Sequence, residues 1–261
     1  MKHKSESKIL SADPLLNWYE LGLPFQSKPE LLGELSVGRT NRSYLIRSGN
    51  TRYILRINAD NSHILGINRQ REKTIIEMAG AFGIAPKVHY CSLHHGLLLT
   101  EYIDGQHWQP DDLKDPGKAT LLTESLAVLH SLPATPTKFG YRQHAEHYWQ
   151  QLELANADIP ERLAEDRNRV LEIIDNIPPR SVTCHHDPLP LNIIEKDGKL
   201  VFLDWEYSAP GWPAFDYAAL SVEWNIAIEK LSLPLSISHD EVQLAKELYI
   251  YLCELWTCLQ A

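Results

Sequence analysis

The feature that most restricts this sequence is a set of three polar residues close to one another in the chain. The stretch CHHDPLPLN, residues 184–192, contains the carboxylate Asp187 and the carboxamide Asn192. A turn, KDGK, and a short apolar run, LVFL, then lead to a second carboxylate, Asp204. An ordinary loop needs turn residues but has no need for this set. The order of loop, hairpin and acid therefore predicts a polar site formed by one loop and the end of the strand that follows it.

The spacing within this set predicts phosphoryl transfer. The pattern His185-x-Asp187-x-x-x-x-Asn192 matches the catalytic loop of kinase-like phosphotransferases. Such enzymes position an alcohol in line with the γ-phosphate of ATP and neutralise charge with Mg²⁺. We expect Asp187 to be the catalytic residue that faces the acceptor hydroxyl. Asn192 and Asp204 would supply oxygen ligands, which Mg²⁺ prefers.

The composition argues against several other classes of protein. The 261 residues carry a formal net charge of −9, which argues against a nucleic-acid partner and permits a cationic ligand. The polar start, MKHKSESKIL, predicts no signal peptide, and no apolar run is long enough to predict a membrane span. The 4 cysteines form no C-x-x-C pair and are expected to be reduced. We therefore expect a cytoplasmic protein, monomeric or homodimeric, with neither a nucleic-acid nor a membrane partner.

Hydrophobic periodicity divides the chain into a strand-rich and a helix-rich part. Residues 30–103 contain alternating runs that predict strands, a hairpin at Gly49-Asn50 and one helix within 66–84. This order predicts an α+β fold of two lobes, with residues 1–103 forming a small antiparallel sheet and one helix, and residues 104–261 forming a larger, mostly helical lobe. Helical spacing in the second lobe covers 117–133, 145–155, 159–178, 214–229 and 240–260.

Several segments together resemble the choline/ethanolamine/thiamine kinase branch of the aminoglycoside phosphotransferase family. They follow the family's order from about residue 33 to residue 224. The resemblance implies a protein-kinase-like fold, a nucleotide-binding first lobe, a catalytic and acceptor-binding second lobe, and the cofactors ATP and Mg²⁺. The segments are LSVGRTNRSY, YILRIN, RQREKTI, LLLTEYIDG, LAVLHSLP, HHDPLPLN and VFLDWEYSAPGWPAFDYAAL.

The resemblance also assigns residues to nucleotide binding. A loop would cover the phosphates with its backbone N–H groups, and Arg56 would bind phosphate in place of a lysine. Glu72 would orient Arg56, with Glu77 as the alternative on the same predicted helix. A hinge would pair with adenine, and Asp216 would brace the catalytic loop. The loop comprises Gly38, Arg39, Thr40 and Asn41, and the hinge comprises Glu101, Tyr102 and Ile103.

The segment after Asp204 is rich in aromatic and acidic residues, which suits a cation that carries a primary hydroxyl. Thiamine is slightly favoured over choline and ethanolamine, and an aminoglycoside is an alternative acceptor. A catalytically silent nucleotide-binding protein of the same fold is a further alternative, against which the complete set of Asp187, Asn192 and Asp204 argues. A metal-dependent hydrolase built on the adjacent histidines at 185 and 186 would need further ligands at suitable spacing, which we do not find. The expected acceptor contacts are Glu206, Tyr207, Trp212 and Trp224.

Overall fold

A computed structural model describes residues 13–35 and 40–260 of the chain. The described residues form two compact units. Unit 1 comprises the residues up to Ala59 together with Val88–Tyr102, and unit 2 comprises Asp60–Lys87 and the chain from Ile103 onward. The expected α+β class and the expectation of two compact parts are confirmed. Two residues of the predicted phosphate-covering loop, Gly38 and Arg39, lie outside the described residues.

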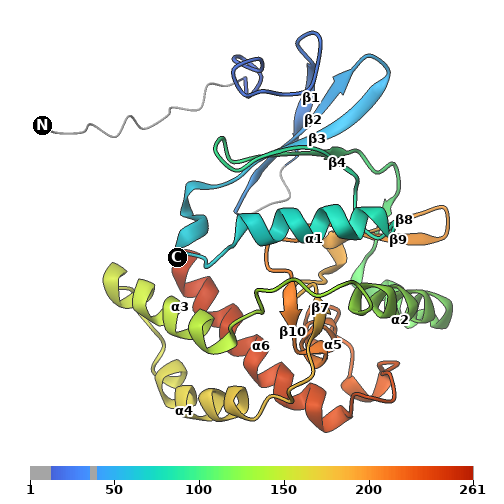
Figure 1. Ribbon diagram of the computed structural model, residues 1–261. Coiled ribbons are helices and arrows are strands. Elements are labelled where there is room, and N and C mark those ends of the chain that lie inside the picture. The colour runs from blue at the N-terminus through green and yellow to red at the C-terminus, as the bar shows by residue number, and fades with distance from the viewer. Residues whose placement is uncertain (1–12, 36–39, 261) are drawn as a thin grey trace, which may run out of the picture. The chain divides into compact units, whose positions relative to one another are not determined.

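Unit 1 contains one antiparallel sheet of five strands (Figure 1). The strand order is β1-β2-β3-β5-β4. Strands that follow each other in the chain pair as hairpins, except that β5 lies between β3 and β4. The predicted hairpin is confirmed, because Ser48 pairs with Thr51 on either side of Gly49 and Asn50. The strands are β1 (Glu30–Leu35), β2 (Arg42–Ser48), β3 (Thr51–Ile57), β4 (Val88–Ser92) and β5 (Leu97–Glu101).

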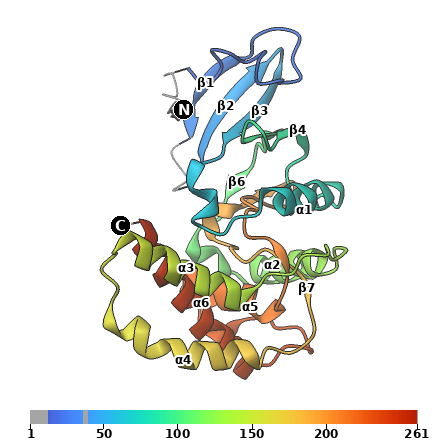
Figure 2. The same cartoon turned by 60° about the vertical axis from the view of Figure 1, so that its left-hand side comes forward.

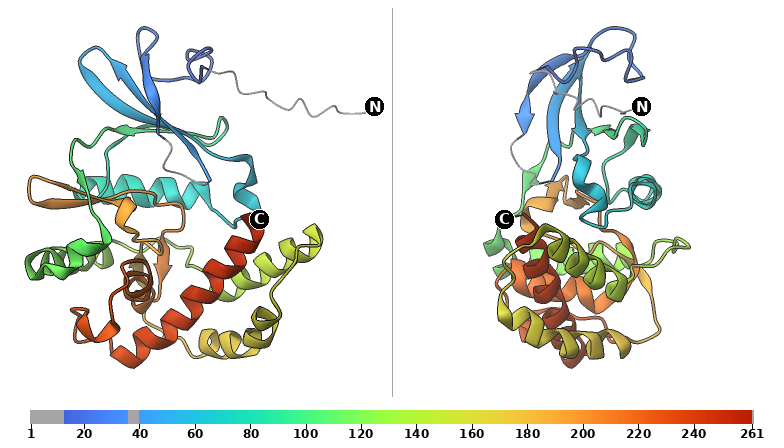
Figure 3. Two further views of the ribbon diagram at one scale, coloured as in Figure 1. Left: turned by 180° about the vertical axis from the view of Figure 1, so that it is seen from behind. Right: turned by 90° about the vertical axis from the view of Figure 1, so that its left-hand side faces the viewer.

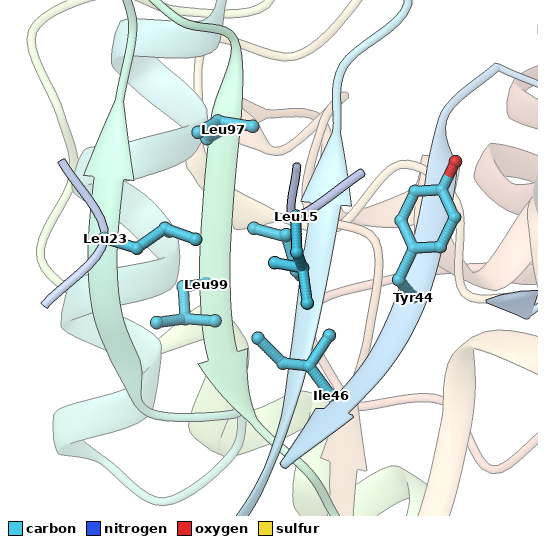
Figure 4. Packing of buried hydrophobic residues seen from close by; sticks show 7 residues of the cluster. Leu15, Leu23, Tyr44, Ile46, Leu97 and Leu99 are labelled. Carbon is cyan, nitrogen blue, oxygen red and sulfur yellow. The ribbon is translucent and has the colours of Figure 1, made fainter. Parts of the chain in front are cut away.

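The core of unit 1 lies on one face of this sheet (Figure 4). Alternate residues point to the same face of a strand, so Tyr44 and Ile46 on β2 lie beside Leu97 and Leu99 on β5 and a leucine of β3. Leucines from the preceding segment, residues 13–28, cover this face. Each leucine that becomes fully buried in this way stabilises the unit by roughly 1.5–3 kcal/mol. The buried cluster is Leu15, Leu23, Tyr44, Ile46, Leu55, Leu97 and Leu99.

Unit 2 is mostly helical, and its last helix organises the others. The helix α6 packs against α3, α4 and α5 (Figure 2). Aspartate and proline begin α2, because the Asp115 side chain accepts the Lys118 N–H and Pro116 occupies the first turn. The helices are α1 (Arg69–Ala81), α2 (Pro116–His130), α3 (Tyr141–Ala155), α4 (Glu161–Asp175), α5 (Pro213–Glu223) and α6 (His239–Gln260), with short 3₁₀ turns at Asp60–His63, Pro110–Lys114, Pro190–Asn192 and Ile228–Lys230.

Two small sheets in unit 2 lie on either side of residues 184–192 in the chain. One pairs β7 with β10, and the other has the order β6-β8-β9. The β8–β9 hairpin lies beside the C-terminal end of α1, where the Phe202 N–H donates to the Ile84 carbonyl at 2.8 Å (Figure 3). The strands are β6 (Gln106–His107), β7 (Val182–Cys184), β8 (Ile193–Lys196), β9 (Lys199–Phe202) and β10 (Ala209–Gly211).

The helix α1 belongs to unit 2, whereas the sequence-based division had placed it in the first lobe with the sheet. The side chains of α1 explain this difference. Arg69, its first residue, forms an ion pair with Glu206 of unit 2 at 3.0 Å. The first unit ends at Tyr102, next to the boundary at 103 that the sequence predicted. Among the described residues, no helix combines the length and apolar character needed to cross a membrane.

Candidate active site

The loop that follows β7 is anchored by hydrogen bonds to Asp216, which lies in the first turn of α5. The Asp216 carboxylate is fully buried and accepts the backbone N–H groups of His185 (3.1 Å) and His186 (2.8 Å). Its second anchor is His130 at the end of α2, whose Nε2 lies 2.9 Å from the carboxylate. Burial alone would raise the pKa of Asp216, but the hydrogen bonds, first that of His130, hold it below its usual value. These contacts support the predicted bracing role of Asp216.

His186 holds a strained position in this loop. Its φ of 68° is rare for a residue with a side chain. The ring stacks on Phe139 with 4.2 Å between ring centres, and its Nε2 lies 2.9 Å from the Tyr141 hydroxyl. The Tyr141 oxygen also accepts the N–H of Trp212 at 2.9 Å. Gly211 must lack a side chain here, because a Cβ would lie 2.6 Å from Nε2 of His186. The neighbours of His186 therefore fix the backbone directly before Asp187.

His185 joins the loop to the strand end that carries Asp204. Its Nε2 lies 2.9 Å from the Leu203 carbonyl and its Nδ1 accepts the Asp187 N–H at 3.3 Å, so the proton is on Nε2. Burial lowers the pKa of His185 to about 4, which keeps this ring neutral. The N–H of Leu203 in turn donates to the Asn192 carbonyl at 2.7 Å. The two backbone hydrogen bonds of Leu203 thus fix the position of Asp204 relative to the loop. Asp204 itself has a left-handed φ of 56°.

The side chains of Asp187 and Asn192 meet directly. The Asn192 amide nitrogen donates to the Asp187 carboxylate at 3.2 Å and to its backbone carbonyl at 3.0 Å. With its NH₂ group used in this way, the amide oxygen of Asn192 remains suited to a metal ion. Burial raises the pKa of Asp187 well above its usual range, and three nearby carboxylates raise it further. These belong to Asp204, Glu206 and Glu223.

This donor set fits a hard divalent cation. Carboxylate and amide oxygens are the ligands that Mg²⁺ prefers. Asp204 and Asn192 offer them, and the hydrogen bond from the Leu203 N–H to the Asn192 carbonyl joins their two segments. Asp204, Glu206 and Glu223 lie near Asp187 and add to the effect of burial on its pKa, and bound cations would offset the charge of these carboxylates. A metal-dependent hydrolase built on His185 and His186 does not fit. Both rings are buried, and the Nε2 atom of each is already hydrogen-bonded. His185 contacts the Leu203 carbonyl and His186 contacts the Tyr141 hydroxyl.

Glu206 carries a partner that the sequence analysis did not anticipate. Arg69 bridges two buried carboxylates, Glu206 at 3.0 Å and Glu72 at 2.9 Å. The two acids are far apart in the sequence, so no local pattern could have predicted the bridge. Glu77, the alternative to Glu72, lies on the exposed side of α1 and pairs with Lys73 at 3.3 Å. The predicted contact of Glu72 with Arg56 would join the two units and stays a prediction.

The predicted substrate contacts occupy different surroundings. Trp212 and Trp224 are only 2% and 3% exposed, and their indole N–H groups bond within unit 2. Trp212 donates to Glu241, and Trp224 donates to the Pro188 carbonyl at 2.9 Å. We therefore revise their role, because both rings are core, and Trp224 contacts the loop that carries Asp187. Tyr207 is half-buried, and its ring forms a T-shaped pair with that of His144, with 5.9 Å between the ring centres.

A second acidic and aromatic pair lies near Asp187. Glu223 ends α5, and Tyr249 of α6 donates its hydroxyl to the Glu223 carboxylate at 2.9 Å. Both residues interact electrostatically with Asp187. Neither Glu223 nor Tyr249 was among the acceptor contacts expected from the sequence. The only available signal was that the last helix would pack somewhere in this lobe.

The predicted nucleotide contacts of unit 1 lie on or beside its sheet. Arg56, on β3, is 9% exposed, and its Nε donates to the Asn58 side chain at 3.1 Å. The Asn41 side chain accepts the Ala59 N–H at 3.3 Å, next to Thr40. Their predicted roles in binding phosphate stay predictions.

The predicted hinge follows the last strand of unit 1. Glu101 ends β5, and Tyr102 comes directly after it, with the Arg52 guanidinium 4.2 Å from the centre of its ring. Ile103 is the first residue of the continuing unit 2 and is buried with Ile194 and Val201. Pairing of this segment with adenine stays a prediction.

Comparison with known proteins identifies relatives across most of the chain. The family model for choline/ethanolamine kinase matches residues 32–255. Ethanolamine kinase 1 of Mus musculus is 27% identical over 204 residues, which cover 69% of this chain and 54% of that protein. The chain therefore spans about half the length of this relative. The LicA homologue of Mycoplasma capricolum is 26% identical over 215 residues, covering 81% of this chain and 87% of the homologue.

A solved structure shows the same fold. The choline kinase LicA from Streptococcus pneumoniae superimposes with a TM-score of 0.77 at 25% identity, and the match covers 95% of this chain and 90% of that one. The expected kinase-like fold is thus confirmed. The family model covers well over half of the chain and includes the catalytic loop, Asp204 and Asp216. This chain belongs to the choline/ethanolamine kinase family.

Proposed function

We propose that this protein is a kinase that transfers the γ-phosphate of ATP to the hydroxyl of a small cationic alcohol of the choline and ethanolamine class. The observation that carries the proposal is the contact between Asn192 and Asp187, with Asp204 tied to the same loop through Leu203. A catalytically silent protein of the same fold would have no need for this arrangement. Membership of the family supports the same conclusion.

Asp187 would act on the acceptor alcohol. Its carboxylate would accept a hydrogen bond from the hydroxyl, orient it toward the γ-phosphate and take its proton as the new bond forms. Asn192 and Asp204 would hold Mg²⁺, which when bound neutralises the phosphate charge. The strained His186 and the buried Asp216 would keep the Asp187 backbone fixed during this step.

The acceptor would be held by carboxylates and tyrosines around Asp187. Glu223 and Tyr249 form one side, and their 2.9 Å hydrogen bond fixes the carboxylate. Glu206 and Tyr207 form another, although Arg69 already offsets the charge of Glu206. Carboxylates attract a cation at long range, and aromatic faces add roughly 0.5–2 kcal/mol for a quaternary or primary ammonium group. Glu223 is therefore the strongest candidate for the cation contact.

Choline and ethanolamine are the acceptors that we favour. The relatives reported above are named for choline and ethanolamine. The slight preference for thiamine that the sequence suggested finds no support among them. An aminoglycoside remains the alternative acceptor, since an acidic site would also suit a polycationic sugar.

A screen of acceptors tests the proposal. ATP consumption is measured with Mg²⁺ and with choline, ethanolamine, thiamine or hygromycin B as the acceptor. We expect choline or ethanolamine to give the highest kcat/KM. A preference for hygromycin B would contradict the acceptor class. Binding of Mg·ATP without turnover of any acceptor would favour a silent protein instead.

A further inference from the structure

A pocket of about 670 Å³ lies in unit 2, between the segment that leads into α1 and the segment that leads into α3. Its volume lies within the usual range of small-molecule sites. Asp187, Asn192 and Asp204 do not line it, although its residue Phe139 stacks on His186, which precedes Asp187. The residues that line it are Gly66, Arg71, Lys138, Phe139, Gly140, Gln143, His144 and His147.

The lining is cationic in a chain whose formal net charge is −9. It contains an arginine, a lysine and two histidines but no carboxylate. Within the part of the chain that the structure describes, neither Arg71 nor Lys138 forms an ion pair with an acidic side chain. Two cations that share a pocket without a counter-charge repel each other, and a bound anion would remove this repulsion.

Arg71 offers unused hydrogen-bond donors. Its Nε is buried and has no acceptor among the described residues. The guanidinium carbon lies 5.9 Å from the centre of the Phe139 ring, which also lines the pocket. Burial lowers the pKa of Arg71, because the charged group is partly removed from water. The two outer nitrogens of a planar guanidinium match two oxygens of a phosphate group.

The pocket wall is fixed by the backbone around it. His147 on α3 contacts the carbonyl oxygen of His63 through Nε2 at 2.8 Å, which joins the α3 side to the α1 side. Gly66 has a φ of 65°, and a Cβ there would lie 2.9 Å from the ring of His144. Asn68 caps α1, whose N-terminal end adds a partial positive charge nearby. The site is therefore largely preformed and has a positive potential.

We propose that this pocket binds the phosphate group of a small phosphate monoester. Arg71 and Lys138 contact the phosphate, and the ring of Phe139 packs against the organic part. The volume supports this assignment, because a free phosphate ion would leave most of the pocket to water. The inference does not depend on the proposed kinase activity, since none of the three catalytic and metal residues takes part.

Calorimetric titration of the full chain tests the proposal without nucleotide and with EDTA present. The two probes are inorganic phosphate and glycerol phosphate, at constant ionic strength maintained with chloride. We expect one site on the wild-type protein, with the tighter binding for glycerol phosphate. Arg71→Gln should weaken binding about tenfold or more, since it removes charge-assisted hydrogen bonds. Lys138→Gln should weaken it several-fold.

Two controls make the outcome specific. Arg142→Gln makes the same charge change on α3, outside the pocket lining, and should bind as the wild type does. Arg71→Gln should keep the wild-type midpoint of urea unfolding, which shows that the fold is intact. Wild-type protein that binds neither probe, or variants that bind as well as wild type, would overturn the proposal. Equal affinity for both probes would overturn the role of Phe139. Should Arg71→Gln not fold, the exposed Lys138→Gln decides the outcome alone.

Discussion

The ring of His185 donates a hydrogen bond from Nε2 to the carbonyl oxygen of Leu203, at 2.9 Å. The Leu203 N–H donates to the Asn192 carbonyl at 2.7 Å, so both sides of this residue are fixed by the catalytic loop. The next residue is Asp204. The position of this candidate metal ligand therefore depends on a buried, neutral histidine.

His185→Ala should lower both stability and metal-dependent nucleotide binding. The change leaves the Leu203 carbonyl without its donor, which costs about 1–3 kcal/mol in the free energy of unfolding. Displacement of Asp204 should weaken Mg·ATP binding several-fold. Urea unfolding and calorimetry measure the two effects. His185→Gln, which keeps a donor, should recover part of both. Equal Mg·ATP affinity in His185→Ala and wild type would refute the positioning role.

Asp204→Ala should remove the Mg²⁺-dependent part of ATP binding. Its carboxylate is the expected link between the metal and the phosphates, whereas Asn192 offers a neutral oxygen. Asn192→Ala should therefore give a milder loss. Calorimetry of ATP binding with Mg²⁺ and with EDTA separates the two contributions. If Asp204→Ala binds Mg·ATP as tightly as wild type does, the metal assignment is wrong.

Glu223→Gln should raise the KM for choline or ethanolamine several-fold and leave the KM for ATP unchanged. Glu223 would face the acceptor cation, and among the described residues no arginine pairs with it as Arg69 pairs with Glu206. Steady-state kinetics at saturating ATP measure the effect. Glu229→Gln, the same change at an exposed position after α5, is the control. A Glu223 variant with an unchanged acceptor KM would exclude it from the cation site.

The buried histidines should make the protein less stable in mild acid. Burial lowers the pKa of His185 to about 4 and the pKa values of His144 and His186 to about 3, from 6.5. Unfolding exposes these rings, which then bind protons below pH 6.5. Their contribution to the unfolding free energy is therefore fully present above pH 6.5 and is lost as the pH falls toward 3 to 4. Burial raises the pKa of Asp187, which opposes this effect.

The net uptake on unfolding is therefore expected to be at most three protons. The unfolding free energy should fall by up to roughly 4 kcal/mol per pH unit between pH 6 and 5. Urea unfolding at a series of pH values measures the slope. His144→Gln should reduce it by about one proton. Stability that does not change between pH 6.5 and 5 would contradict the neutral, buried state of these rings.

The parts of the site that lie close together in sequence could be predicted, because their spacing reflects their geometry. Asp187, Asn192 and Asp204 are separated by one loop and one hairpin, so a local pattern contains all three. The β2–β3 hairpin is predictable for the same reason, since Gly49 and Asn50 form a turn between two alternating runs.

Contacts between distant segments left no such pattern. His130 reaches Asp216 from the end of another helix, and Arg69 reaches Glu206 from the start of α1. Trp212 was expected at the substrate because tryptophan can bind cations, yet composition does not distinguish a binding ring from a buried one. The same limit applies to α1, because its ion-pair partner Glu206 in unit 2 lies more than a hundred residues later.

Turnover by Asp187→Asn tests the central claim most directly. The amide keeps the shape of the side chain and its hydrogen-bonding capacity near Asn192, but it cannot take a proton. We expect phosphorylation of choline or ethanolamine to be nearly abolished while ATP affinity stays within a few-fold of wild type. A variant that phosphorylates either acceptor with the wild-type kcat would show that Asp187 is not the catalytic residue.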